Sequence, residues 1–387
     1  MSFVAKIYRD LKGDRAIWII VAVLTVFSVL TVYSASGSLA YQLSRNTEYY
    51  LMKQVVVIAL GLGLTYICYQ LNYLKYSRIA PLLLLISIPL LMYTFFFGNA
   101  VNEARRWINV PLIGLTFQTS DFAKLALIIY LARSISSKQD YIKDFNSAFV
   151  PLILPVLVIC GLIAPHDLST AALLFMTCLI MMFIGRVHIY NIGVLFLFGL
   201  VLLAMIIILG QFFPEFVRLD TWTTRLTDFF TNSDGDYQIR QAKIAIADGG
   251  WFGVGPGNSI QRNYLPYAYA DFIYAIICEE YGLLGGFVIL GMYLWLFFRC
   301  AAIVTKCPKA FGAILAIGLC LNIVIQAFAN IAVSVHMVPV TGLTLPLVSY
   351  GGSSILVTCI SFGIILSVSK YIEHASMNKL EFNEADE

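Results

Sequence analysis

The chain has 387 residues, 60% of them hydrophobic and only 12% charged, with a mean hydropathy of +0.83. Soluble domains carry about 25% charged residues, so this composition excludes an ordinary soluble protein and indicates an integral membrane protein. The net charge of +3 is too small to favour nucleic acid as a partner. The eight cysteines form no CxxC pair, which argues against a disulfide framework or a zinc site.

Ten apolar windows are long enough to predict membrane helices. In chain order they cover residues 16–36, 52–71, 77–97, 121–135, 147–164, 168–185, 189–211, 271–299, 309–334 and 343–369. The sequence therefore predicts an all-α polytopic membrane protein with about ten transmembrane helices in one domain, residues 16–370. Residues 1–15 precede this domain, and residues 371–387 form an acidic tail. No small-residue cleavage site follows the first window, so we expect it to be retained as a helix rather than removed as a signal peptide.

The basic residues predict the orientation of these helices. An even number of spans places both termini on one side, and most basic residues outside the longest loop fall on that side. The positive-inside rule makes that side the cytoplasm. The longest loop, residues 212–270 between the seventh and eighth windows, then lies on the outer face. Long structured loops in compact proteins are usually functional, so we expect this loop to contribute to a site.

A glycine-rich run, GGWFGVGPGNS at residues 249–259, lies in this loop. Glycine permits tight turns and close approach of the backbone to a ligand, and consecutive backbone N–H groups can bind a phosphate. The alternative is an ordinary loop that needs glycine at its turns. The run is not a dinucleotide fingerprint, because no strand, turn and helix surround it.

Three carboxylates near the start of the eighth window need an explanation. Asp271 precedes a long helical run, so it is either an N-cap or a general base whose pKa is raised by partial desolvation. Glu279 and Glu280 lie about 12–14 Å further along the helix and should face the bundle interior. Structural hydrogen bonding is the favoured role for both, and by helical angle only Glu279 can share a cavity with Asp271.

The stretch NEARRWINVPLIGLTFQTSDFAKLALIIYLA, residues 102–132, begins with a basic and aromatic cluster. Arg105, Arg106 and Trp107 suit a headgroup anchor at the membrane surface. They equally suit a diphosphate substrate, because arginine pairs with phosphate through two parallel hydrogen bonds. Position alone leaves both readings open.

The same stretch then enters the fourth predicted helix. Ser120 can cap this helix, and Asp121 and Lys124 are spaced to pair on one helix face. The alternative for Lys124 is a lysine that extends its charged end to the membrane surface.

Two further stretches carry polar residues within apolar surroundings. In PHDLST, Asp167 is placed to cap the sixth predicted helix. In the ninth window Asn322, Gln326 and Asn330 form one polar stripe, which either binds helices together or lines a hydrated cavity. The segment TGLTLPLVSYGGSS, residues 341–354, is expected to begin the tenth helix and to pack closely against that stripe.

Four of these stretches together resemble the SEDS family, which includes FtsW, RodA and SpoVE. They are ARRW…QTSDFAKLALIIYLA, PHDLST, YQIRQAKIAIADGGWFGVGPGNSIQRNYLP…DFIYAIICEEYGLLG and PVTGLTLPLVSYGGSS. The similarity covers about residues 15–370 in the family's order. Within the family, SDFAKLALIIYLA looks more like the division members than the elongation members.

The resemblance implies a ten-helix bacterial glycosyltransferase of the cytoplasmic (inner) membrane that polymerises lipid II into peptidoglycan. Asp271 matches the family's catalytic aspartate, which implies that it takes the proton from the acceptor's sugar hydroxyl as that hydroxyl attacks C1 of the donor. The polyprenyl diphosphate leaves, and arginines, Lys124 or a divalent cation (Mg²⁺ or Mn²⁺) would offset its charge. The implied partners are a class B penicillin-binding protein, other division proteins and membrane lipids.

The predicted site residues follow from these motifs. Asp271 is predicted to be catalytic, and the predicted substrate-binding residues are Arg105, Arg106, Trp107, Asp121, Lys124, Arg225, Gln238, Ser349 and Ser353. The predicted structural or cavity residues are Glu279, Glu280, Gln326 and Asn330. No metal ligands are assigned.

The chain departs from the family's usual sequence in several places. Where the family commonly reads LPEAHTDF, this chain reads LPYAYADF, with Tyr267, Tyr269 and Ala270 at the Glu, His and Thr positions. Thr119 replaces a usual proline, Asp121 a usual glutamate, and PHDLST a usual QPDLGT. Any role of that glutamate or histidine is therefore absent or moved.

Three other functions remain open at this point. An elongation-type polymerase would share the chemistry. A transporter that moves lipid II across the membrane would also show intramembrane acids and a polar helix stripe. A non-catalytic scaffold for division proteins would not need Asp271.

Overall fold

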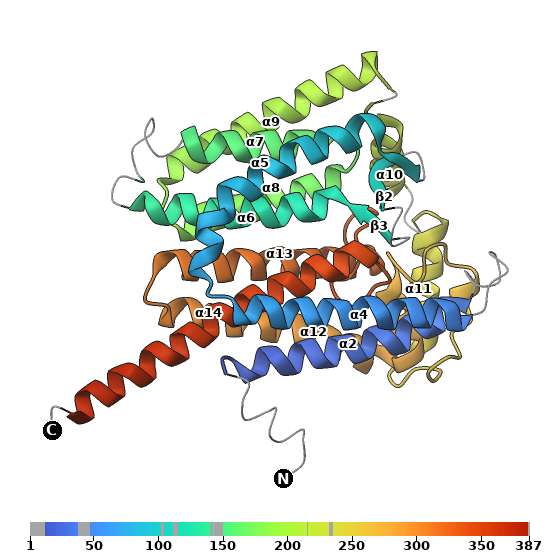
Figure 1. The fold of residues 1–387 in the computed structure, drawn as a ribbon. Coiled ribbons are helices and arrows are strands. Elements are labelled where there is room, and N and C mark those ends of the chain that lie inside the picture. The colour runs from blue at the N-terminus through green and yellow to red at the C-terminus, as the bar shows by residue number, and fades with distance from the viewer. Residues whose placement is uncertain are drawn as a thin grey trace, which may run out of the picture.

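The computed structural model describes residues 12–37, 47–101, 104–110, 115–139, 142, 150–214, 216–231 and 235–385. The chain folds into a bundle of helices that lie side by side, with one small sheet at an end of the bundle (Figure 1). Each of the ten apolar windows coincides with a helix. These helices are α2 (Arg15–Ala35), α4 (Thr47–Gln70), α5 (Leu74–Phe97), α6 (Thr119–Ser137), α7 (Val150–Ile163), α8 (Leu168–Ile184), α9 (Ile189–Phe212), α12 (Ile273–Lys306), α13 (Ala310–Ser334) and α14 (Gly352–Ala385).

Within the described residues, seven helices are long and apolar enough to cross a membrane. They are α2, α4, α5, α9, α12, α13 and the first part of α14, up to Ala375, while α7 and α8 are apolar but shorter. Helix α13 lies at the centre, where it packs against α6, α8, α12 and α14. Helix α9 is the least buried of the seven and exposes apolar side chains to its surroundings. The protein is a multi-pass membrane protein.

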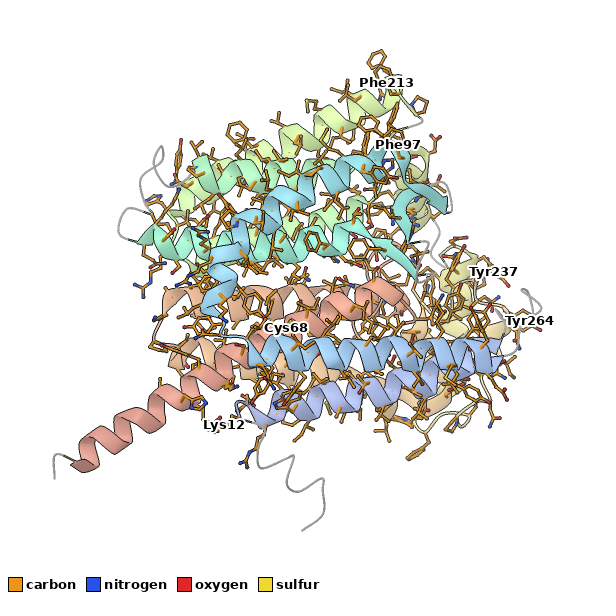
Figure 2. The ribbon with its side chains drawn as sticks, viewed as in Figure 1. Lys12, Cys68, Phe97, Phe213, Tyr237 and Tyr264 are labelled. Carbon is orange, nitrogen blue, oxygen red and sulfur yellow. The ribbon has the colours of Figure 1, made fainter. Side chains whose placement is uncertain are left out.

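The two ends of the bundle differ. The sheet and the helices between α9 and α12 gather at one end, whereas α2 begins and α14 ends at the other (Figure 1). Phe97, Phe213, Tyr237 and Tyr264 lie at the first end, and Lys12 lies at the second (Figure 2).

The sheet lies between α5 and α6, where the sequence was expected to form only a loop. Its three antiparallel strands are β1 (Asn99–Val101), β2 (Ala104–Val110) and β3 (Leu115–Gln118), in that order across the sheet. Strand β2 pairs Trp107 with Gln118 of β3. The all-α prediction is therefore wrong at this point. The strands are short, so the alternation of apolar and polar residues along them was too brief to predict strands in a sequence dominated by long apolar windows.

The long connection between α9 and α12 is folded rather than extended. It contains α10 (Leu219–Thr231), α11 (Tyr237–Gly249) and a single turn of 3₁₀ helix, η3 (Gln261–Asn263). Helix α11 buries Ile239, Ala242 and Ala245 and packs against α12. This packing fixes the connection to the bundle.

Helix α12 is broken at Gly282, whose φ of 71° and ψ of −176° are not helical. The glycine-rich loop fills the break with hydrogen bonds that replace the missing helical ones. Val254 N–H donates to the Glu279 carbonyl at 2.9 Å, Gly255 N–H to the Glu280 carbonyl at 3.0 Å, and Leu283 N–H to the Gly250 carbonyl at 2.9 Å. A Cβ at Gly249, Gly253 or Gly282 would collide with backbone across this contact. Gly249, Gly253 and Gly282 therefore serve close backbone packing, and the positive φ angles of Gly253, Gly255 and Gly257 agree with the alternative of a loop that needs glycine at its turns.

Helix α14 begins at Gly352, so residues 343–351 are not helical as predicted. The chain from about residue 335 to 351 is irregular, with a φ of 70° at Gly342, and Leu343, Leu345, Leu347 and Val348 are buried. Buried backbone groups outside a helix need partners. Side chains provide them: Asn330 donates to the Leu343 carbonyl, Gln326 to the Thr344 carbonyl, Tyr293 to the Pro346 carbonyl and Ser28 to the Val348 carbonyl.

Candidate functional site

A cavity of about 410 Å³ opens among the elements at the sheet end of the bundle. Its walls come from α4, β2, β3, α6, the start of α8, α10, the loop before α12 and the irregular segment before α14. Segments that lie far apart in the sequence therefore meet around one space. Irregular backbone at membrane depth is tolerated where it is buried in protein or lines a cavity, and the segment before α14 does both.

Asp271 lies on the wall of this cavity, in the turns that precede α12. Its backbone carbonyl accepts a hydrogen bond from Asn330 Nδ2 at 2.7 Å, and the carbonyl of Ala270 accepts one from Ser349 Oγ at 2.6 Å. Tyr267 begins the turn with a φ of 56°, a conformation that is uncommon for a bulky residue. Its carbonyl accepts the N–H of Asp271 at 3.1 Å. The backbone around Asp271 is thus held from three directions.

The carboxylate of Asp271 does not cap α12. The residue at the cap position is Phe272, and among the described residues the carboxylate has no hydrogen-bond or ion-pair partner. Burial raises the pKa of this carboxyl to about 6, although the guanidinium groups of Arg225 and Arg106 act in the opposite direction. A carboxylate that has a pKa near neutrality and faces a cavity suits a general base.

Arginines lie close to Asp271. A side chain added at Gly342 would come within 3.7 Å of Asp271 Oδ2 and 4.0 Å of an Arg225 Nη atom, so both groups border the same space. Arg225 also donates to the Val340 carbonyl at 3.0 Å. Burial lowers the pKa of Arg225, as do Arg218 and Arg106 nearby, while Asp271 raises it. Three arginines therefore share one region, which favours an anionic ligand there.

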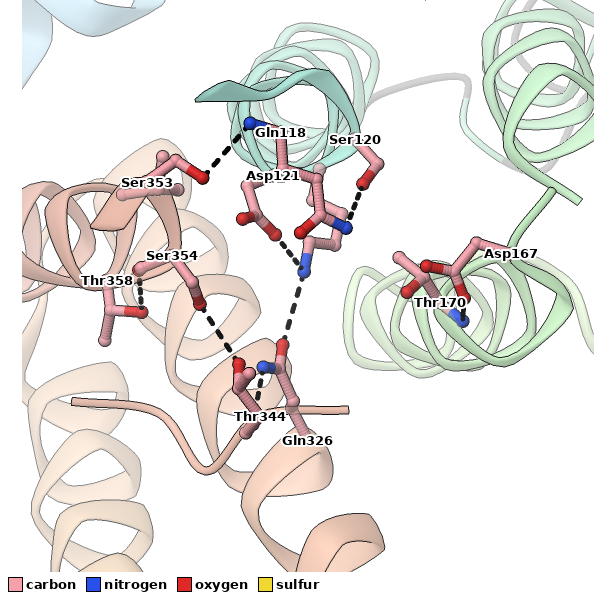
Figure 3. Close-up of polar contacts among 12 residues, drawn as sticks. Gln118, Ser120, Asp121, Asp167, Thr170, Gln326, Thr344, Ser353, Ser354 and Thr358 are labelled. Carbon is pink, nitrogen blue, oxygen red and sulfur yellow. Dashed lines mark hydrogen bonds and ion pairs between the residues drawn. The ribbon is translucent and has the colours of Figure 1, made fainter. Parts of the chain in front are cut away.

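Arg106 is held between the sheet and the start of α8. Its guanidinium donates to the His166 carbonyl, through Nε at 2.8 Å, and forms an ion pair with Asp167 Oδ2 at 3.0 Å. The other oxygen of Asp167 accepts the Thr170 N–H at 3.1 Å and so caps α8, as predicted (Figure 3). One carboxylate thus starts a helix and positions an arginine.

A second polar network crosses the cavity from α6 to α13 (Figure 3). Lys124 forms the predicted ion pair with Asp121 at 2.9 Å and donates to Gln326 Oε1 at 3.2 Å. Gln326 Nε2 donates in turn to the Thr344 carbonyl at 2.9 Å. Lys124 is buried, so it does not extend to the membrane surface. The buried Oδ2 atom of Asp121 has no partner among the described residues and is available to a ligand.

Ser120 does not cap α6, because this helix begins at Thr119 with Gln118 at the cap position. Ser120 instead accepts a hydrogen bond from Gln118 Nε2 at 3.0 Å (Figure 3). Thr119, the residue at the family's usual proline position, shares a hydrogen bond with Thr94 of α5 at 2.9 Å.

The cavity carries a net positive charge. Five basic side chains line it (Lys53, Arg106, Lys124, Arg218 and Arg225) against three acidic ones (Asp121, Asp167 and Asp271), which leaves two positive charges in excess. Ligands that carry two or more negative charges fit this balance. A diphosphate is such a ligand.

The structure brings most of the predicted site residues to this cavity. Those that line it are Arg106, Trp107, Asp121, Lys124, Arg225, Asp271 and Gln326. Three others lie behind the wall and hold it: Asn330 and Ser349 fix the backbone near Asp271, and Ser353 Oγ accepts the Gln118 N–H at 3.1 Å (Figure 3). The side chain of Arg105 lies outside the described residues.

Gln238 lies in a neighbouring pocket of about 400 Å³ between α10 and α11. Arg225 borders both spaces. A direct contact between Gln238 and a ligand held beside Asp271 is therefore not expected from the geometry.

Glu279 and Glu280 are buried and do not line the cavity. Glu279 accepts hydrogen bonds from the Ile260 and Gln261 N–H groups, at 2.8 and 3.1 Å, and from Ser259 Oγ. Glu280 accepts one from Ser34 Oγ of α2. These contacts agree with the structural role predicted for both, and Glu279 does not share the space around Asp271.

Several residues at the cavity were not predicted to be site residues. They include Lys53, Arg218, Tyr267, Tyr269 and Tyr350, although Tyr267 and Tyr269 were noted as departures from the family's sequence. Lys53 had a usable signal, since a lone lysine within an apolar window should face the bundle interior or a cavity. Arg218 was one of several loop arginines, and nothing in the pattern separated it from the others.

Comparison with known proteins identifies the family. A family model described as "Cell cycle protein", that of FtsW, RodA and SpoVE, matches residues 14–374. The chain belongs to this family. A probable peptidoglycan glycosyltransferase FtsW of Geobacter sulfurreducens is 34% identical over 368 residues, which covers 94% of this chain and 97% of the relative. A protein of the same name from Alkalilimnicola ehrlichii is 37% identical over 370 residues, with 92% and 90% covered.

Solved structures support the fold of the FtsW, RodA and SpoVE family. A chain from a peptidoglycan synthase complex, studied for the coordination of polymerization and crosslinking, matches with a TM-score of 0.72 at 24% identity and covers 92% of this chain and 98% of that one. The rod shape determining protein RodA of Thermus thermophilus matches with a TM-score of 0.67, again at 24% identity, with 94% and 98% covered.

Proposed function

We propose that this protein is a peptidoglycan glycosyltransferase that polymerises lipid II into glycan strands, for the septal wall in cell division. The observation that carries the proposal is the carboxylate of Asp271, which faces a cationic cavity without a hydrogen-bond or ion-pair partner among the described residues. The family membership and the names of the relatives point to the same reaction.

Asp271 acts as the general base in this reaction. It takes the proton from the acceptor's sugar hydroxyl as the hydroxyl oxygen attacks C1 of the donor sugar, with inversion at that carbon. The bond from C1 to the diphosphate oxygen breaks, and the polyprenyl diphosphate leaves with the electron pair. The raised pKa of Asp271 suits proton transfer near neutral pH.

The excess positive charge of the cavity stabilises the leaving diphosphate. Arg225 borders the same space as Asp271 beside Gly342, and Arg106 and Arg218 extend the same region. Fixed cations in a partly desolvated site stabilise developing charge without reorganising, which is often the largest contribution to catalysis. The neutral disaccharide would then lie toward Asp271, where C1 and the acceptor hydroxyl meet.

A divalent cation, Mg²⁺ or Mn²⁺, is a further part of the proposal. No three acidic, histidine or cysteine side chains converge as metal ligands in the described part of the chain. Mg²⁺ is commonly held by one or two carboxylates together with water and substrate phosphates, so a complete protein cage is not needed. The Oδ2 atom of Asp121 is a carboxylate oxygen that fits this mode. When bound, the ion would neutralise diphosphate charge.

The proposal also fixes the protein's place in the membrane. All ten helices that match the apolar windows cross the bacterial inner membrane, both termini are cytoplasmic, and the sheet, α10 and α11 face outward. The start of α2 and the end of α14 lie at the same end of the bundle, as expected for an even number of spans (Figure 1). A class B penicillin-binding protein is the expected partner, because a solved relative of this fold comes from a complex of polymerization and crosslinking.

The test is glycan polymerisation from purified lipid II by wild type and Asp271→Asn, with the partner co-purified and a divalent cation present. Loss of a general base typically costs about 10²- to 10⁴-fold in rate, so the variant should make almost no product while remaining folded. Asp248→Asn is the matched control, because Asp248 is an exposed aspartate of α11 away from the cavity.

Two other outcomes would redirect the proposal. If Asp271→Asn polymerises as fast as wild type, the base lies elsewhere in the cavity. If wild type makes no product while a known polymerase works in the same assay, transport of lipid II or a scaffold role becomes the better explanation.

A further inference from the structure

Four tyrosines form a continuous row beside the cavity, in the order Tyr50, Tyr350, Tyr269 and Tyr267. The centroids of successive rings are 6.2, 5.8 and 6.3 Å apart, and successive ring planes are turned by 70°, 84° and 65°. These are edge-to-face contacts of the kind that aromatic rings prefer. We call this row the tyrosine ladder.

The ladder joins three separate parts of the chain. Tyr50 comes from α4, Tyr350 from the segment before α14, and the other two from the turns before α12. A backbone hydrogen bond from Tyr350 N–H to the Tyr269 carbonyl, at 2.9 Å, fixes the last two parts to each other. Tyr50 is buried at the back, while Tyr350, Tyr269 and Tyr267 line the cavity.

The ladder lies next to Asp271 in the chain, since Tyr269 is only two residues before it. The cavity wall thus has two kinds of surface near this carboxylate. Arginines provide positive charge, and the ladder provides apolar ring faces and hydroxyl groups without charge. Burial raises the pKa of Tyr269 and Tyr350 to about 12, so both phenols stay protonated and can donate hydrogen bonds.

These properties suit a sugar rather than a phosphate. A pyranose ring presents an apolar face of C–H groups and a rim of hydroxyl and acetamido groups, which match the face and the hydroxyl of a tyrosine. A neutral phenol would add little binding energy for a diphosphate, because several cations in the cavity can already bind it. Tyr267 and Tyr269 are also positions at which this chain departs from the family's usual Glu and His.

From this arrangement we propose that the tyrosine ladder binds the N-acetylated hexosamine rings of the lipid-linked substrate and holds them against Asp271, while the arginines hold the diphosphate. The inference rests on the proposed function, because it takes lipid II as the substrate. It assigns Tyr267, Tyr269 and Tyr350 as sugar-contacting residues that distinguish the sugar-bearing substrate from the bare lipid diphosphate.

The experiment compares two ligands that share a lipid diphosphate and differ in their sugars. Equilibrium binding of lipid II and of a sugar-free polyprenyl diphosphate is measured for the purified full chain in detergent. The variants are Tyr269→Ala and Tyr350→Ala, which remove the ring, and Tyr269→Phe and Tyr350→Phe, which keep it. Tyr93→Ala is the control, because Tyr93 is an exposed tyrosine of α5 that packs on Phe97 away from the cavity.

We expect each alanine variant to bind lipid II about 5- to 10-fold more weakly, as loss of one aromatic contact implies. The phenylalanine variants should lose only about 2- to 3-fold, the lower end of what one hydrogen bond contributes. Binding of the sugar-free lipid diphosphate should not change in any variant, and Tyr93→Ala should bind both ligands as wild type does. Tyr350→Leu, which keeps apolar volume without an aromatic ring, replaces the alanine variant if that variant does not fold.

Two results would overturn the ladder's role. Equal losses for both ligands would mean that the rings only support the cavity wall. Unchanged affinity for lipid II in the alanine and leucine variants would mean that the rings only pack against one another. Failure of the proposed function looks different, because wild type would then make no glycan from lipid II, whatever its affinity for the two ligands.

Discussion

Asp271 and Glu279 are carboxylates eight residues apart on one segment, and the chain treats them in opposite ways. Glu279 is buried and accepts hydrogen bonds from Ser259 and from two backbone N–H groups. Asp271 faces a cavity, and its carboxylate has no hydrogen-bond or ion-pair partner in the part of the chain that the structure describes. The protein satisfies one acid internally and leaves the other to a ligand.

The glycine-rich loop and the cavity show the same contrast. The glycine-rich loop donates the N–H groups of Val254 and Gly255 to carbonyl groups at the break in α12, so these two are not available to a phosphate. The cavity instead relies on side-chain cations. A buried acid or a run of glycines is therefore evidence of function only when its own chain does not already use it.

The largest effect on the structural side should follow Gly253→Ala. A Cβ at Gly253 would collide with the carbonyl of Glu280, and the φ of 81° adds strain. We expect a loss of more than about 3 kcal/mol in stability, seen as a large fall in apparent Tm in detergent or a failure to fold.

Gly257→Ala separates collision from strain. Gly257 has a similar φ of 80°, but a Cβ there meets no atom within 4 Å. This variant should lose only about 1 kcal/mol. Equal losses for the two variants would show that strain alone matters, and that the loop does not depend on close contact with α12.

Glu279→Gln should come next in size. Gln keeps the shape of Glu279 but replaces one accepting oxygen with an NH₂ group. That NH₂ group would face hydrogen-bond donors, and the charge-assisted hydrogen bonds to the carboxylate would be lost. Hydrogen bonds to charged groups contribute about 1.5–3 kcal/mol, so we expect a loss of that order in stability. Asp271→Asn is the comparison, and it should leave the apparent Tm unchanged while it abolishes polymerisation. A Glu279→Gln variant as stable as wild type would contradict the structural role.

Gly342→Ala tests the functional side with a small change. Its Cβ would lie 3.7 Å from Asp271 Oδ2 and 4.0 Å from Arg225, which is ordinary contact, but it would occupy space that a substrate needs. Misplacement of a reacting group by about 1 Å can cost up to about 10²-fold in rate, so we expect a 10- to 100-fold lower kcat. The loss of stability should be no larger than in Gly257→Ala. An unchanged kcat would contradict the prediction, because it would mean that the reacting atoms lie away from Gly342.

Much of the helical fold follows from the sequence, because long apolar windows admit few alternatives. All ten windows coincide with helices, although only seven helices meet the length and hydropathy of a membrane span in the described chain. The start of α14 was misplaced because Leu343 to Val348 are apolar but irregular, and their backbone depends on Asn330, Gln326 and Ser28 from other helices. Hydropathy records burial and contains no information about such distant partners.

The site was predictable where a residue's type fixed its chemistry. The ion pair of Asp121 and Lys124 follows from helical spacing, and the resemblance pointed to Asp271. The tyrosine ladder was not predictable, because Tyr50, Tyr269 and Tyr350 meet only through tertiary packing and tyrosine is common in apolar segments. Ser120 was misassigned as a cap because α6 begins two residues earlier than its sequence suggested.

The smallest expected effect concerns the pH dependence of the reaction. Asp271 works as a base only when it is deprotonated, and burial raises its pKa to about 6, so kcat/KM should fall about tenfold per pH unit below that value. The same shift acts on stability with a definite sign. Since the folded pKa lies above the ordinary value of 3.8, this carboxyl favours the folded state most below about pH 4, and that contribution is lost as pH rises through about 6.

Arg225→Gln sharpens this prediction by removing the cation that most lowers the pKa of Asp271. The acidic limb of the kcat/KM profile should then move to higher pH, in addition to any loss of rate from weaker diphosphate binding. Arg240→Gln, at an exposed arginine of α11 outside the cavity, should leave the limb in place. If the acidic limb of the kcat/KM profile stays near pH 6 in Arg225→Gln, the charge of Arg225 does not affect the pKa of the titrating base. The base would then have to be sought among the cavity's other acids, Asp121 and Asp167, which already have basic partners of their own.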